Sequence, residues 1–170
     1  MIEPQSNGKT DEVYTPNYAI NPLLPYIKKE WVVFECAYGA GHLAESMRSR
    51  GLTVVGNANV DFLKRGIVGF ENCDCIVTNP PYSLKTKFLK KCYEVGKPFA
   101  LLLPLTALEG KKRNALYREN GVEVIIPDRR IHFIMTDTRM GKKSSSWFQT
   151  AWFTHGFGVT PQLCFVEGDW

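Results

Sequence analysis

Residues 31–43 read WVVFECAYGAGHL, a continuous apolar run that leads into a turn with glycines at positions 39 and 41. A run of this kind is typical of a strand buried on both faces, as in parallel sheets. The next stretch, GHLAESMRSRG (41–51), has apolar residues four positions apart and a final glycine, which predicts a helix. Glycines between a strand and a helix let a ligand approach the main chain. Many strand–helix turns contain two glycines, so this turn alone is weak evidence of a site.

Strand and helix patterns alternate on both sides of position 100. Beyond the first strand, we expect strands at LTVVG (52–56), near 59–62, at CDCIVTN (73–79) and at FALLLPL (99–105). Helices are expected at 83–96 and 107–120, and the later segments GVEVII, RIHFIM and SWFQTAWFTHGF are β-branched and aromatic. The order predicts an α/β sheet whose last strand is antiparallel. Residues 1–13 are polar and lack periodicity, so we expect a flexible arm before a single domain over 14–170.

The composition is that of a folded chain: 44% of the 170 residues are hydrophobic and 22% are charged. The 21 lysines and arginines exceed the 17 acidic residues, and the net charge of +4 permits an anionic partner without requiring one. No apolar run is long enough to span a membrane, and the polar N-terminus lacks a signal peptide. The five cysteines follow no framework spacing, which favours reduced thiols. We expect a cytoplasmic protein with no membrane partner and no metal site.

The segment TNPPYS (78–83) closes a predicted strand with two consecutive prolines. Prolines have no N–H and a fixed φ, so they hold the chain rigidly. The side-chain oxygen of Asn79 and the carbonyl oxygen of Pro80 then form a pair of acceptors, with the ring of Tyr82 beside them. Two acceptors and a stacking face suit a planar amino group. The alternative is a tight turn, but one that begins with asparagine and ends with an aromatic residue at a strand end is rare.

Four motifs in this order carry a resemblance: Thr15-Pro16, then Glu35 to Gly41, Asp61-Phe62 and Asn79 to Tyr82. Together they resemble S-adenosylmethionine-dependent amino-methyltransferases, above all the N6-adenine DNA methyltransferases, including small phage-type members. The likeness spans roughly residues 14–155. It implies a doubly wound, Rossmann-like seven-stranded sheet with the cofactor at the carboxyl ends of its first strands. It also implies S-adenosylmethionine as cofactor, DNA as partner and, for a phage protein, the cytoplasm of a bacterial host.

The resemblance assigns roles to particular residues. Asn79, Pro80, Pro81 and Tyr82 would form the catalytic segment that holds the target base. The cofactor would contact, in chain order, Tyr14, Thr15, Pro16, Glu35, Cys36, Ala37, Gly39, Gly41, Asn57, Asp61, Phe62 and Asn79. One position departs from the family, which has an acidic residue at the end of the second strand where this chain offers Asn57 or Asn59. An amide accepts more weakly than a carboxylate, which costs on the order of 1–2 kcal/mol of cofactor affinity.

Positive charge is concentrated between residues 111 and 143, a stretch that contains nine lysines and arginines but only four acidic residues. Arg139, Lys142 and Lys143 lie in a stretch rich in glycine and serine, where phosphate contacts are expected. A solvated loop is an equally weighted interpretation. Arg130 and Phe133 resemble a family segment that packs near the extruded base, although Phe133 as a strand core residue is nearly as good an interpretation.

The leading hypothesis is methyl transfer to the N6 amino group of adenine in DNA, by flipping of the base. We expect no separate target-recognition domain, and therefore a short or relaxed target sequence or a partner that supplies recognition. An RNA adenine or the side-chain amide of a protein glutamine would suit the same acceptors. A third hypothesis is a catalytically degenerate nucleic-acid-binding protein with the methyltransferase fold, motivated by the missing acidic residue. The sequence does not give the oligomeric state.

Overall fold

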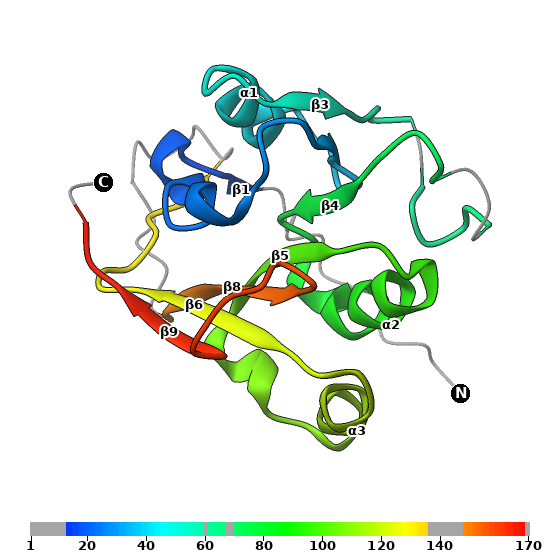
Figure 1. The fold of residues 1–170 in the computed structure, drawn as a ribbon, viewed down its shortest axis with the longest axis vertical. Coiled ribbons are helices and arrows are strands. Elements are labelled where there is room, and N and C mark those ends of the chain that lie inside the picture. The colour runs from blue at the N-terminus through cyan, green and yellow to red at the C-terminus, as the bar shows by residue number, and fades with distance from the viewer. Residues whose placement is uncertain (1–12, 60, 67–69, 136–147, 169–170) are drawn as a thin grey trace, which may run out of the picture.

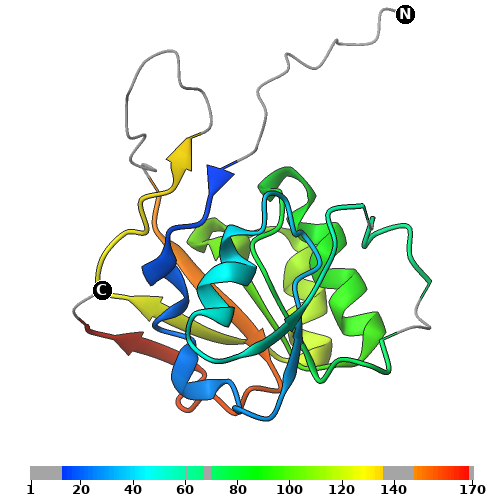
Figure 2. The same ribbon diagram turned by 90° about the horizontal axis from the view of Figure 1, so that it is seen from above.

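A seven-stranded sheet forms the centre of the computed structural model, which describes residues 13–59, 61–66, 70–135 and 148–168 (Figure 1). The strands lie in the spatial order β3-β2-β4-β5-β8-β6-β9. Their bounds are β2 Val32–Phe34, β3 Thr53–Val55, β4 Cys75–Thr78, β5 Phe99–Pro104, β6 Glu123–Pro127, β8 Thr150–His155 and β9 Leu163–Val166. Two further strands, β1 (Val13–Tyr14) and β7 (Ile134–Met135), pair antiparallel beside the main sheet (Figure 2).

The sheet is mixed, which confirms the expected α/β fold. Strands β3, β2, β4 and β5 are parallel to one another, whereas β8 is antiparallel to both β5 and β6. This antiparallel strand lies inside the sheet, between β5 and β6, and it is not the last strand of the chain. That strand, β9, pairs parallel with β6 at the edge and was not predicted from the sequence.

Helices cover both faces of the sheet and produce two separate hydrophobic cores (Figure 1). On one face lie α1 (His42–Arg48) and the short 3-10 helices η1 (Asn17–Ile20) and η2 (Leu24–Tyr26); on the other lie α2 (Lys85–Val95) and α3 (Lys111–Asn120). All six residues of β5 are buried: Ala100 and Leu102 pack in the first core, and Phe99, Leu101 and Leu103 in the second. This alternation explains why the central strands are apolar throughout.

The strand expected near residues 59–62 is wrong, since the described residues of that stretch form turns. A side-chain oxygen of Asp61 accepts hydrogen bonds from the main-chain N of Leu63 at 3.1 Å and of Lys64 at 3.4 Å. Local bonds of this kind offer the main chain an alternative to a sheet ladder. The ring of Phe62 is buried in the second core, although its residue is in no strand. The seventh strand of the sheet is therefore β9, at the opposite edge.

Candidate functional site

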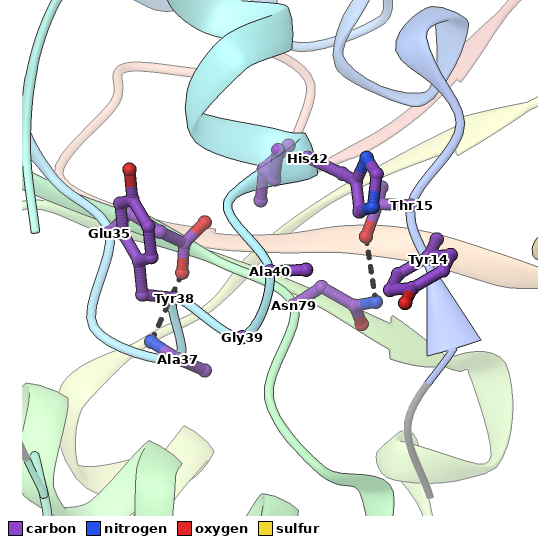
Figure 3. Close-up of a pocket in the computed structure, with 10 residues that line it drawn as sticks. Tyr14, Thr15, Glu35, Ala37, Tyr38, Gly39, Ala40, His42 and Asn79 are labelled. Atoms are coloured by element: carbon purple, nitrogen blue, oxygen red, sulfur yellow. Dashed lines mark hydrogen bonds between the residues drawn. The ribbon is translucent and has the colours of Figure 1, made fainter. Parts of the chain in front are cut away.

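A pocket opens where β2 and β4 end, at the carboxyl edge of the sheet (Figure 3). Three segments that are far apart in the sequence line it: the end of β1 with the residue that follows, the stretch from the end of β2 to the first residues of α1, and the residue after β4. The lining residues are Tyr14, Thr15, Glu35, Ala37, Tyr38, Gly39, Ala40, His42, Leu43 and Asn79. The structure therefore brings together six of the residues predicted to contact the cofactor: Tyr14, Thr15, Glu35, Ala37, Gly39 and Asn79.

The turn between β2 and α1 depends on Gly41, which precedes the helix and has a φ of 83°. Residues with a side chain rarely adopt that conformation. A Cβ atom at this position would also lie 2.9 Å from the ring of Tyr38. The carbonyl of Gly41 accepts from the main-chain N of Glu45 at 2.9 Å, which begins the helix. The glycine thus lets the chain turn tightly enough for its main chain to line the pocket.

Glu35 lies at the bottom of the site and is 1% exposed. Its Oε1 accepts from the main-chain N of Ala37 at 3.1 Å and from the hydroxyl of Thr78, while its Oε2 is buried and has no hydrogen-bond partner among the described residues. Burial raises the pKa of this carboxyl to about 8, although the two hydrogen bonds act in the opposite direction. Once the carboxyl has lost its proton, the free oxygen is an acceptor available to a donor in the pocket.

Asn79 approaches from the other side of the pocket and is oriented by Thr15. Its Nδ2 donates to the hydroxyl oxygen of Thr15 at 3.0 Å, a bond drawn in Figure 3. Because the nitrogen is held in this way, the position of the amide oxygen is also set. That oxygen, Oδ1, is buried and has no partner among the described residues. The site therefore contains a second oriented acceptor.

Tyr82 follows the two prolines and lies in an aromatic group. Its ring meets those of Phe133 and Phe148 edge-on, with centroid distances of 6.3 Å and 5.8 Å. Burial raises the pKa of its hydroxyl, so that group remains a protonated donor. Phe133 is 4% exposed and packs in the first core, as its interpretation as a core residue expects, while its place beside an extruded base stays a prediction.

Unpaired buried polar atoms mark this site. Among the described residues, four buried side-chain atoms lack a hydrogen-bond partner; two belong to the pocket residues Glu35 and Asn79, and a third is the hydroxyl of Tyr82, three residues after Asn79. The fourth is the hydroxyl of Thr150, in β8. Buried polar groups are nearly always paired, since an unpaired one costs about 1–3 kcal/mol. A ligand with hydrogen-bond donors would satisfy the oxygens of Glu35 and Asn79, and an acceptor would satisfy the Tyr82 hydroxyl.

Three of the residues predicted to contact the cofactor, Asn57, Asp61 and Phe62, do not line this pocket. Asn57 is exposed, and its side-chain oxygen accepts from the main-chain N of Asn59 at 2.9 Å. Asp61 is exposed and forms an ion pair with Lys64 at 3.2 Å. The hydrogen bond from the Lys64 side chain lowers the pKa of the Asp61 carboxyl. Phe62 is 2% exposed, within the second core. The binding roles of Asn57, Asp61 and Phe62 stay predictions.

The other predicted residues occupy varied places around the site. Pro16 and Pro80 are buried, and the carbonyl of Pro16 accepts from the main-chain N of Ala19 to begin η1. Cys36 is buried in the second core, and burial raises the pKa of its thiol. Pro81 is half-buried ahead of the 3-10 helix η3 (Tyr82–Leu84), and Arg130 is exposed beyond the end of β6. Arg139, Lys142 and Lys143 lie outside the described residues.

Tyr38 is part of the site and was missed by sequence reasoning. A Cβ at Gly56, just after β3, would lie 2.7 Å from the Tyr38 ring and 2.6 Å from the carbonyl oxygen of Glu35. The guanidinium of Arg48 donates to the Tyr38 hydroxyl at 3.1 Å and to the carbonyl of Val54 at 2.9 Å. The ring is thereby held at the end of β3. The signal was the glycine at position 56, which leaves room for a ring.

Two negative findings apply to the part of the chain that the structure describes. No helix there is long and apolar enough to cross a membrane. No group of three or more histidine, cysteine or acidic side chains there is arranged to hold a metal ion.

The comparisons with known proteins show the fold. No protein-family model and no curated protein matches the sequence. A type I restriction-modification system methyltransferase subunit from Streptococcus thermophilus has a TM-score of 0.61 and 19% identity, over 92% of this chain and 47% of that one. A protein assigned as a modification subunit of a type I restriction enzyme from Vibrio vulnificus has a TM-score of 0.57 and 13% identity, over 87% and 45%.

This chain thus has the α/β fold found in methyltransferase subunits, and it spans about half the length of those two proteins. At these identities the likeness establishes the fold alone. A protein assigned as an RNA methyltransferase, from Pyrococcus horikoshii, is more distant, with a TM-score of 0.47 and 12% identity over 81% of this chain and 79% of that one.

Proposed function

We propose that this chain binds S-adenosylmethionine in the pocket and transfers its methyl group to the N6 atom of adenine in DNA. The observation that carries the proposal is the oxygen of Asn79, which is buried, unpartnered among the described residues and oriented by Thr15 beside the Glu35 pocket. The order of motifs in the sequence supports it, as does the fold shared with a protein named as a restriction-modification methyltransferase subunit and one named as a modification subunit of a restriction enzyme.

The residues of the pocket suit the methionine part of this cofactor. The free oxygen of Glu35 would accept from its ammonium group, and the main chain of Ala37 and Gly39 is open for close contact. A carboxylate accepts from an ammonium group more strongly than a neutral acid does, so we expect Glu35 to lose its proton on binding. When bound, the cofactor supplies a methyl group activated by a positively charged sulfur.

The chain's own contribution to the reaction is positioning. The lone pair of an aromatic amino group is delocalised into the ring, which makes the nitrogen a weak nucleophile. Hydrogen bonds to the oxygen of Asn79 and the carbonyl of Pro80 would draw the two hydrogens aside and aim the lone pair at the methyl carbon. The N–C bond forms as the C–S bond breaks, and the amino proton leaves to water afterwards. The ring of Tyr82 would stack on the base, which must first leave the duplex.

The experiment is transfer of a labelled methyl group from S-adenosylmethionine to duplex DNA, followed by digestion and identification of the labelled nucleoside. We expect label on N6-methyladenine. In the Asn79→Ala variant the rate of methyl transfer should fall roughly a hundredfold or more, since one oriented hydrogen-bonding group that stabilises the transition state contributes about that much. Asn120→Ala, at the exposed last residue of α3, is the matched control. Label on another base, or full transfer by Asn79→Ala, would contradict the proposal.

One observation favours a second candidate, a binding protein without turnover. The end of β3 carries no carboxylate, and Tyr38 lies against the glycine there. Calorimetric titration with S-adenosylmethionine separates the two: an absence of binding up to millimolar cofactor, together with binding to DNA, would replace the enzyme by the binding protein. Parallel transfer assays with transfer RNA and a protein extract test an RNA adenine and a glutamine amide as acceptors.

A further inference from the structure

Two helices begin at the edge of the sheet where the pocket lies. Helix α2 follows β4 and the 3-10 helix η3, and α3 follows β5 and the 3-10 helix η4 (Leu105–Leu108). Because β4 and β5 are parallel, their carboxyl ends meet at the same edge, and the first turns of both helices lie there. The two helices pack side by side on one face of the sheet (Figure 1).

Arg113 fixes the two first turns relative to each other. Its guanidinium donates to the hydroxyl of Thr86 in α2 at 2.9 Å and to the carbonyl of Ala107 in η4 at 2.8 Å. A planar guanidinium bound at both ends holds its partners at a set separation. The first turns of α2 and α3 therefore form one continuous surface.

The charge of this surface is the reverse of what helix stability favours. Lys87, Lys111 and Lys112 are exposed in the first turns, and neither first turn contains an acidic residue. The positive end of each helix dipole lies here, where acidic residues stabilise the helix and lysines destabilise it. None of the three lysines takes part in an ion pair among the described residues, although Glu109 is close in sequence; further along α2, Lys90 does pair with Glu94, at 3.7 Å.

The first turn of α2 follows the segment from Asn79 to Tyr82 closely in the chain. The Nζ of Lys85, the first residue of α2, donates to the carbonyl of Tyr82 at 3.1 Å. We propose that Lys87, Lys111 and Lys112 bind backbone phosphates of duplex DNA next to the base held by Asn79 and Tyr82. Phosphates have the charge that both the lysines and the helix dipoles attract. This inference rests on the proposed function and adds to it the surface that holds the duplex.

The experiment compares two triple variants with the wild type. Lys87→Ala, Lys111→Ala and Lys112→Ala together remove the surface. Lys29→Ala, Lys90→Ala and Arg118→Ala together remove the same charge from exposed positions away from that edge. Binding of a fluorescent duplex of about 20 base pairs, long enough to cover a protein of this size, is measured by anisotropy at several salt concentrations. Each lost phosphate contact makes the slope of log K against log salt shallower by about 0.9. Three lost contacts reduce the affinity drop between 50 and 200 mM salt by about 40-fold.

The outcomes separate this inference from the proposed function. A shallower slope and a raised KM for DNA in the first variant, with the control like the wild type, support the surface. Equal slopes in the two variants overturn it, even if the wild type methylates DNA. If the wild type methylates DNA and the first variant loses affinity only for duplex RNA, DNA is the wrong partner for the surface. If the wild type does not methylate DNA but its binding depends on the three lysines, the proposed function fails and the surface stands. Thermal melting of each variant shows that it is folded.

Discussion

The buried carboxyl of Glu35 makes the stability of this protein depend on pH, and replacement by glutamine removes that dependence. In the folded chain its pKa is raised to about 8 by burial, against an ordinary value of 4.5. At pH 7 the group is therefore protonated in the folded state and ionised in the unfolded state. Its Oε1 keeps its bonds to Ala37 and Thr78 in either form, and the side-chain oxygen of a glutamine would offer the same acceptor. The neighbouring thiol of Cys36 also has a raised pKa and stays neutral.

The sign follows from proton counting. Between pH 4.5 and pH 8 the folded state binds the proton and the unfolded state does not, so the free energy of unfolding falls as pH rises. The contribution of Glu35 is fully present below pH 4.5 and is lost progressively up to its folded pKa of about 8. Each pKa unit is worth about 1.4 kcal/mol, so the wild type should lose about 3 kcal/mol relative to Glu35→Gln between pH 5 and pH 8.

The assay is urea unfolding of both proteins at pH 5, 6, 7 and 8 at constant ionic strength. The quantity of interest is the difference between them, because the other ionisable groups cancel in it. Glu30→Gln, at an exposed carboxyl outside the helices, is the control for the substitution itself. A constant difference between wild type and Glu35→Gln across this range would refute the reasoning, since it would mean that Glu35 is ionised in the folded protein.

Three shorter predictions concern other parts of the fold. Gly56→Ala should lower the free energy of unfolding by about 1–3 kcal/mol, because its Cβ would lie 2.6 Å from a main-chain oxygen; unchanged urea unfolding would contradict that close approach. Trp152→Phe removes a buried bond from the indole N–H to the carbonyl of Ala19, 2.8 Å long, and should cost about 1–3 kcal/mol in the same assay. Lys112→Glu should raise the free energy of unfolding by about 0.5–1 kcal/mol through the helix dipole while weakening DNA binding, and unchanged DNA binding would argue against the proposed surface.

The central strands were predictable because burial on both faces leaves a continuous apolar run. FALLLPL and CDCIVTN each contain such a run, and β5 and β4 lie within them. The edge of the sheet was not predictable in the same way. In β9, Leu163 and Phe165 are 48% and 73% exposed while the residues between and after them face inward. An exposed apolar residue breaks the alternation that identifies a half-buried strand, and the pairing with β6 is not visible in the local sequence.

The candidate site was predicted in part. The glycine turn and the segment from Asn79 to Tyr82 carry sequence motifs, and the pocket is lined by residues of that turn, by Asn79 and by Tyr14 and Thr15 from the N-terminal motif. The position of Tyr38 was not predictable, because it depends on packing against Gly56, after β3, and on a hydrogen bond from Arg48, at the far end of α1. A motif specifies which residues are present, but the packing between segments decides which of them meet.

The unfavourable local features of the described chain are collected at one edge of the sheet. The unpartnered oxygens of Glu35 and Asn79 lie there, and so do the lysines at the positive ends of α2 and α3. In the two cores, by contrast, the strands and helices follow the usual rules of burial and periodicity. Each unfavourable feature is complementary to one part of a ligand. The unpaired acceptor oxygens would accept from hydrogen-bond donors, and the lysines would bind phosphates. Ligands with these groups would remove the penalties together, so binding at this edge should also stabilise the fold.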